Sequence, residues 1–351
     1  MHNIYRLVNR KAMGIKMIIT LNKAIVHIIA AGIDNTMYSD CEIDLSDAGI
    51  SSFIVSHLEK MYDDPAMRTG EFSSNSGLKY HISEYAAEQT SFRDLSEIIA
   101  KRLQEGISQS EIALPSDIIV CDCIIHERQM IAILKCDNKT GFTHRVLQED
   151  GQIKNEIINY YAILPPVTQR LSDCAFIEIE DMTMKFKGKS VTLDGQKLNL
   201  MSDVLLECEY GISPKEALAK VQKTAKEITE EYGGDTVATD VKIKQLIKNT
   251  PVEEDSVKTE EIAEAVFEAS PAAREEFIQK VREAEVPEVI EKTEYVEKRI
   301  DKNIKIVTDT GIEISFPAEY YRDEDNVSII NNDDGTISIT INNISQILNK
   351  S

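Results

Sequence analysis

Residues 117–137, DIIVCDCIIHERQMIAILKCD, contain two apolar runs on either side of a short polar segment. Residues 117–125 and 130–137 are rich in isoleucine and valine, a composition typical of β-strands. The polar turn His126-Glu127-Arg128-Gln129 between them predicts an antiparallel hairpin. We therefore expect this part of the chain to form an antiparallel sheet.

The surrounding sequence adds helices before this hairpin and more strands after it. Helical spacing predicts a helix over residues 47–62, and Ser91 followed by Asp94 resembles a capping box that opens another. Residues 68–77 are polar and rich in Gly and Ser, which predicts a loop. Further strands are expected at residues 18–29 (with a bulge at Asn22-Lys23), 142–147, 152–158, 175–180, 183–187 and 190–193.

From residue 213 the apolar period becomes helical, and near the end of the chain it returns to β. Four amphipathic helices are predicted at residues 213–232, 240–249, 260–269 and 270–284. Two hairpins follow, at residues 305–316 and 327–341. The predicted fold class is α+β, with an antiparallel sheet domain and flanking helices (17–200), a helical segment (201–290) and a C-terminal β-hairpin region (291–351). Residues 1–16 are either native or an extended, disordered start before a natural first residue Met17.

The chain of 351 residues carries a net charge of −21, and the acid is spread unevenly. Residues 17–200 hold 17 basic and 27 acidic side chains, whereas residues 201–351 hold 18 and 33. Such acidity favours solubility and opposes non-specific phosphate binding, so contact with nucleic acid requires a local basic patch. The N-terminal apolar stretch is interrupted by Asn22, Lys23 and His27, which argues against a membrane span.

We find none of the common nucleotide-binding or hydrolase motifs, and the sequence predicts no cofactor. Cys121, Cys123, His126 and Cys136 resemble a zinc set, but only one residue separates the first two cysteines. Because apolar residues surround them, we interpret them as reduced core cysteines of a cytoplasmic protein. Glu178, Glu180 and Asp181 form an acidic group at a strand end, the type of group that holds magnesium in nucleases.

The most compact basic patch of the body is Lys185-Phe186-Lys187-Gly188-Lys189, and Lys197 follows it. On a strand, Lys185 and Lys187 share one face, where they could contact DNA phosphates. The alternative interpretation is an edge strand protected by lysines against aggregation. Lys220 and Lys223 have the spacing of a helical stripe and are further candidates for nucleic-acid binding.

Several of these segments together resemble the bacterial nucleoid-associated protein family of the NdpA type. They are LNKAIVH (residues 21–27), the hairpin at 118–134, LSDCAFIEI (residues 171–179) and the closing β segment at 312–348. The resemblance covers roughly residues 17–351 and rests on the order of the elements and on scattered residues. It implies association with the nucleoid and with DNA, and it offers no catalytic set to transfer.

Three hypotheses follow. The first is a non-enzymatic nucleoid-associated protein that binds double-stranded DNA through its lysines. The second is an acidic module that joins nucleoid or DNA-maintenance proteins with little direct DNA contact. The third is a metal-dependent nucleic-acid enzyme using Glu178, Glu180 and Asp181. We expect a location in the cytoplasm and nucleoid and no membrane partner; a homodimer would join two basic patches and raise avidity.

Overall fold

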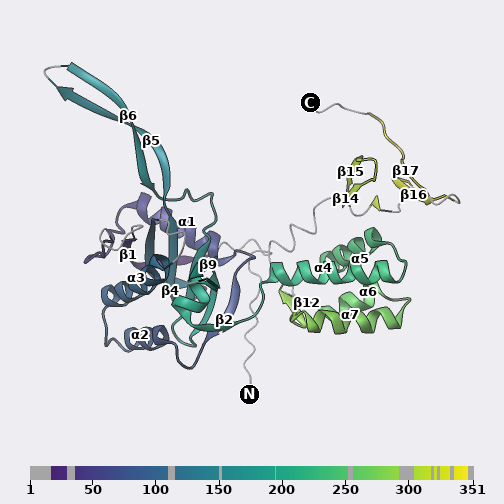
Figure 1. Cartoon of the computed structure of the whole chain (residues 1–351), viewed down its shortest axis with the longest axis horizontal. Coiled ribbons are helices and arrows are strands. Elements are labelled where there is room, and N and C mark those ends of the chain that lie inside the picture. Colours follow the sequence, from purple (N-terminus) through teal and green to yellow (C-terminus); the bar gives the residue numbers. More distant parts are fainter. Residues whose placement is uncertain are drawn as a thin grey trace. The chain divides into compact units, whose positions relative to one another are not determined.

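The computed structural model describes residues 17–29, 36–109, 115–149, 152–193, 195–251, 256–291, 304–317, 320–321, 325–332 and 336–346. The described residues up to Ser213 form one compact unit, and those from Pro214 onward form a second (Figure 1). The expected extended start at residues 1–16 lies outside the described residues. No helix in the described ranges is long and apolar enough to cross a membrane.

The first unit is built on a seven-stranded sheet in which every neighbouring pair of strands is antiparallel. The strand order is β1-β3-β4-β7-β8-β2-β11. The bounds are β1 Ile19–Ile29, β2 Arg68–Phe72, β3 Ser116–Ile125, β4 Arg128–Asp137, β7 Asp173–Glu178, β8 Thr183–Lys187 and β11 Cys208–Tyr210. Together with the helices described below, this arrangement confirms the predicted α+β class.

The β3–β4 hairpin is confirmed, but its turn is tighter than predicted. Ser116 pairs with Asp137 and Ile125 pairs with Arg128, which leaves only His126 and Glu127 in the turn. Both have positive φ, 51° and 67°, as a two-residue hairpin turn of the primed type requires. Although Arg128 and Gln129 are polar, they belong to β4, because the pairing of β3 with β4 includes both of them.

Each face of the sheet has its own apolar core. Ile118 and Val120 of β3 point into one core, and Ile119 and Cys121 point into the other. The first core is covered by α2, α3 and a π-helical turn, and the second by α1. Their bounds are α1 Ala48–Tyr62, α2 Gly77–Ala86, α3 Phe92–Ser108 and η2 Leu200–Leu206. The N-caps Asp47 and Ser91 confirm the two predicted helix starts.

The bulge predicted in the first strand is confirmed. The register of β1 against β3 shifts between Leu21 and Lys23. Because one extra residue reverses the alternation, Leu21 and Ala24 face the same core although they are three residues apart. The side-chain amide of Asn22 donates a hydrogen bond to the carboxylate of buried Asp122 at 3.0 Å.

Two predictions about the far side of the sheet are wrong. The loop expected at residues 68–77 contains β2 and the first residue of α2, and β2 pairs with both β8 and β11. Its polar sequence RTGEF gives no strand signal, so tertiary pairing decides its structure. The interpretation of residues 183–187 as an edge strand also fails, because β8 lies between β7 and β2.

A long hairpin leaves the sheet between β4 and β7. It consists of β5 Lys139–Glu149 and β6 Gln152–Ile163, both longer than predicted. Within the described residues these two strands pair only with each other, and Figure 1 shows them extending away from the sheet. A shorter hairpin joins β9 Ser190–Leu193 to β10 Gln196–Asn199.

Within its described residues, the second unit contains four helices and three two-stranded sheets. The helices, all four predicted, are α4 Pro214–Glu231, α5 Thr236–Asn249, α6 Thr259–Val266 and α7 Pro271–Glu283. The paired strands are β12 Ser256–Lys258 with β13 Val289–Glu291, β14 Ile304–Val307 with β15 Glu313–Phe316, and β16 Val327–Asn331 with β17 Ile337–Ile341. The last two pairs confirm the two predicted C-terminal hairpins.

Two details differ from the predicted organisation of the chain. Residues 201–213, expected in the helical segment, contribute most of η2 and all of β11 to the first unit. The helical segment and the C-terminal β region, expected to be separate, share one apolar core. In that core Val241 of α5 packs with Ile304, Phe316 and Val327.

Candidate nucleic-acid interface

The predicted basic patch lies at the end of β8. Met184 and Phe186 point into the core beneath α2 and α3. Because side chains alternate along a strand, Lys185 and Lys187 both point to the opposite face, on the side of α1. The ammonium of Lys185 lies 5.2 Å from the centre of the Tyr62 ring, a cation–π contact. The sequence therefore placed these two lysines on one face correctly.

Lys187 is paired with a buried carboxylate. Its ammonium lies 3.0 Å from Oδ2 of Asp64, and the Arg170 guanidinium lies 3.1 Å from the same oxygen. Burial alone would raise the pKa of Asp64, but the Ala66 amide, Lys187 and Arg170 together hold that pKa below its usual value. Asp64 is therefore an anion that positions two cations.

Lys189 contacts a second pair of aspartates. Its ammonium lies 3.4 Å from Asp137, and its backbone N–H donates to Asp173 at 2.8 Å. The ammonium of Lys135 bridges the same two carboxylates. Burial raises the pKa of Asp173, whereas at Asp137 the lysines outweigh burial and lower the pKa. The two carboxylates thus hold Lys135 and Lys189 at the end of the sheet.

These contacts form two groups at the same end of the sheet, which we together call the charge cluster. Its members are Asp64, Lys135, Asp137, Arg170, Asp173, Lys187 and Lys189. Lys187 pairs across strands with Cys174, the residue after Asp173, so the alternation of side chains places the Asp64 group and the Asp173 group on opposite faces of the sheet. Four cations oppose three anions, and the burial is unequal: Asp64 and Asp173 are each 2% exposed, but Arg170 is 48% and Lys189 57% exposed. The charge that faces solvent is therefore predominantly positive.

The other predicted lysines lie elsewhere. Lys197 is exposed on β10 of the first unit. Lys220 and Lys223 are on α4 of the second unit, where Lys220 donates to the Ala284 carbonyl at 2.6 Å. Lys223 is exposed and lies 3.7 Å from Glu227. The six lysines therefore do not belong to one cluster, and Lys220 is engaged in capping the end of α7.

The acidic group proposed for magnesium already contains a cation. Arg128 donates to Glu178 at 2.6 Å, and its guanidinium lies 3.8 Å from Asp181. Asp181 also accepts from the amide and hydroxyl of Thr183. Glu180 is exposed. Within the described ranges, no group of three or more His, Cys, Asp or Glu side chains is arranged to hold a metal ion.

The cysteines of the zinc-like set are core residues, as interpreted. Cys121, Cys123 and Cys136 are fully buried in the core beneath α1, together with Cys174. Burial raises the pKa of Cys123 and of Cys136 to about 12. Because zinc binds thiolates, this environment opposes the charge state that a ligand needs.

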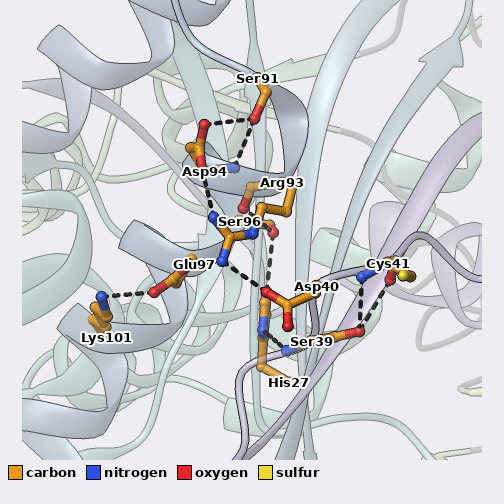
Figure 2. Close-up of polar contacts among 10 residues, drawn as sticks. All are labelled: His27, Ser39, Asp40, Cys41, Ser91, Arg93, Asp94, Ser96, Glu97 and Lys101. Atoms are coloured by element: carbon orange, nitrogen blue, oxygen red, sulfur yellow. Dashed lines mark hydrogen bonds and ion pairs between the residues drawn. The ribbon is translucent and has the colours of Figure 1, made fainter.

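The buried histidine of β1, His27, lies beside a serine. In nucleophilic catalysis a histidine in this position acts as the base that activates the serine. Figure 2 shows His27 between Ser39 and Ser96. The Ser39 amide donates to Nδ1 at 3.1 Å, and Nε2 lies 3.0 Å from the Ser96 hydroxyl. Because Nδ1 accepts, the neutral ring carries its proton on Nε2 and donates it to Ser96. Ser96 in turn donates to the Arg93 carbonyl at 2.7 Å.

This hydrogen-bond chain runs from the histidine to the serine, the reverse of what a general base requires. Burial lowers the pKa of His27 to about 4, opposed by Glu97 and reinforced by Arg93. The Arg93 side chain contacts Asp40, Asp94 and Glu97 around it. The network therefore ties the segment after β1 to the start of α3. His27 is a core histidine.

Sequence reasoning missed Arg170 and the three aspartates of the charge cluster. Arg170 is one basic residue in a loop, which gives no signal by itself. Asp137 and Asp173, however, each lie at the end of an apolar strand, where a buried acid requires a partner. That rule could have predicted Asp137 and Asp173 as partners for nearby lysines.

The fold and the charge cluster define an acidic α+β protein whose antiparallel sheet holds cations at one end. The family model described as nucleoid-associated protein YejK matches residues 25–349, and the chain belongs to this family. The match confirms the predicted bacterial nucleoid-associated family. A search of curated proteins found no match to the chain.

Proposed function

We propose that this nucleoid-associated protein binds double-stranded DNA directly and non-enzymatically, through the exposed cations of the charge cluster. The observation that carries the proposal is the layered burial of charge, with aspartates beneath and Lys189 and Arg170 outside. Backbone phosphates would meet the cations first, because the acids lie behind them. Family membership supports a place in the nucleoid.

The acidic background limits how strong this contact can be. Residues 1–213 carry 21 basic and 30 acidic side chains, and residues 214–351 carry 18 and 30. Long-range attraction to DNA is therefore absent, and binding depends on close contacts. Each phosphate contact releases counterions, so the logarithm of affinity falls by about 0.9 per contact for each tenfold rise in salt.

The test is a salt titration of duplex DNA binding with the double variant Arg170→Gln/Lys189→Gln. Folding should be preserved, since Asp64 keeps Lys187 and Asp137 keeps Lys135. We expect the affinity to fall and the salt slope to lose about 1.8, two contacts at about 0.9 each. Fluorescence anisotropy of a labelled duplex measures both quantities.

The matched control is Lys258→Gln/Lys305→Gln, which removes two exposed lysines that also have carboxylate partners in the second unit. Its salt slope should equal that of the wild type. No binding by the wild type at low salt, or equal losses in both variants, would refute the proposal. Magnesium-dependent DNA cleavage that Glu178→Ala abolishes would refute its non-enzymatic part.

A second candidate is an acidic module that contacts nucleoid or DNA-maintenance proteins through the second unit. It is favoured by the charge of α6 and α7 with their flanks: residues 256–291 hold four basic and ten acidic side chains. Charge reversal at exposed Glu268 and Glu275 should weaken capture of basic nucleoid proteins while leaving DNA affinity unchanged. Unchanged capture would reject this candidate.

A further inference from the structure

The two faces of the β5–β6 hairpin differ sharply in composition. Cross-strand partners share a face and side chains alternate along each strand, so each residue of 142–148 and 152–161 is assigned to one of the two faces. On one face, Glu156 is paired with Arg145 at 2.9 Å and with Lys154 at 2.5 Å. We call this the charged face of the hairpin.

The other face contains no Lys, Arg, Asp or Glu over the same length. It carries five large apolar side chains, which are Phe142, Val146, Ile153, Ile157 and Tyr161. All five are exposed, with Phe142 at 78% and Ile157 at 82%. The remaining positions hold two asparagines, a glutamine and His144. We call this the uncharged face.

Such a surface requires cover in solution. A two-stranded hairpin is marginal in water, and stability normally comes from a third strand or from packing of an apolar face. Among the described residues, neither apolar core of the first unit includes a residue of β5 or β6, so the side chains of the uncharged face do not pack into these cores. Exposed apolar surfaces of this kind mark interaction sites.

We propose that the uncharged face packs against the same face of a second copy of this chain, so that two hairpins form a small sandwich. The charge distribution selects this occupant. A chain of net charge −21 repels its own copies, and the uncharged face is a surface where two copies meet without opposing like charges. A DNA duplex is a poor occupant, because this face offers no cation to phosphate.

The dimensions of the hairpin agree with a two-fold contact. Eleven residues at about 3.4 Å each carry the tip of the hairpin about 35 Å from its base. This distance is well beyond the Debye length of about 8 Å, so at the tip the charges of the sheet are largely screened. The five apolar side chains alone expose on the order of 500 Å², a large part of the about 800 Å² that each partner contributes to a typical stable complex. A two-fold axis would place each apolar residue against the same set in the partner.

The charge cluster lies at the root of this hairpin. Asp137 ends β4, and Lys139 begins β5 two residues later. The paired hairpins would therefore join two charge clusters in one particle, which raises avidity for any long anionic polymer. The dimer itself does not depend on DNA binding, so failure of the DNA titration would leave this inference standing.

The experiment compares full-length Ile157→Lys with Thr143→Lys by sedimentation equilibrium over a wide range of protein concentration. Ile157 is on the uncharged face, whereas Thr143 is on the charged face of the same hairpin, and both are exposed. We expect the wild type and Thr143→Lys to have twice the chain mass. Ile157→Lys should raise the dimer dissociation constant about a hundredfold or more, because both copies lose a buried isoleucine.

A mixing experiment then tests the identity of the partner. Val146→Lys/Ile157→Lys and Val146→Asp/Ile157→Asp should each be monomeric, and an equal mixture at low ionic strength should dimerise. The proposal is overturned if the wild type is monomeric at every concentration, or if Thr143→Lys dissociates as much as Ile157→Lys. A monomeric wild type whose DNA affinity depends on Ile157 would assign the face to nucleic acid instead.

Discussion

Acidification should destabilise the first unit through His27. The ring is fully buried on β1, and burial lowers its pKa from 6.5 to about 4. The unfolded chain binds the proton as the pH falls through 6.5, but the folded chain does not bind it until the pH approaches 4. Because the unfolded state holds more protons in this window, the free energy of unfolding falls as the pH falls.

The magnitude follows from the size of the pKa shift. One pKa unit corresponds to 1.36 kcal/mol, so the difference between 6.5 and about 4 corresponds to about 3 kcal/mol. The loss begins near pH 6.5 and is complete below pH 4. Against a typical domain stability of about 5–15 kcal/mol, this one ring is a substantial fraction.

Urea unfolding followed by circular dichroism at several pH values between 7 and 4.5 measures the effect. The chain has no tryptophan, so the secondary-structure signal is the practical probe. His27→Gln keeps an amide donor and acceptor but removes the titration, and its stability should fall less steeply with acid. The difference isolates His27, since the carboxylates titrate in both proteins.

Thr143→Gln is the matched control, because it introduces the same side chain at an exposed position of the β5–β6 hairpin and removes no titrating group. Its pH dependence should match that of the wild type. The reasoning is refuted if His27→Gln and wild type lose stability in parallel. It is also refuted if nuclear magnetic resonance shows the His27 ring titrating near pH 6.5 in the folded protein.

Two further changes test the packing of the sheet. Glu127→Gly relieves a positive φ in the β3–β4 turn and should raise the free energy of unfolding by about 1 kcal/mol, so an unchanged or lower urea midpoint would contradict the assigned turn. Phe186→Ala removes a fully buried ring of β8 and should cost about 3–5 kcal/mol, whereas Tyr80→Ala at an exposed position should change stability by less than about 0.5 kcal/mol; equal effects would contradict the core.

Local signals in the sequence predicted most of the elements. Asp47 and Ser91 marked helix starts because their side chains accept from the first free amides of a helix. The β3–β4 hairpin was predictable from the sequence because strands that are buried on both faces are apolar along their whole length. The elements that escaped prediction, such as β2 and β11, are short or polar and become strands only through their neighbours.

The candidate site was predicted in part. Alternation along a strand placed Lys185 and Lys187 on one face. Their partners could not be predicted, because Asp64 and Arg170 are far from β8 in the sequence and meet Lys187 only after folding. The same limit applied to Glu178, since Arg128 reaches it across the pairing of β4 with β7.

The sequence by itself determined the family, the α+β class, the acidity and the position of the lysines along the chain, because composition, periodicity and capping are local properties. Only the tertiary structure decided which charges are neutralised, which strand lies at an edge, and that the hairpin of β5 and β6 exposes apolar side chains on an uncharged face. These features depend on strand order, register and burial, which arise from contacts between residues distant in the sequence.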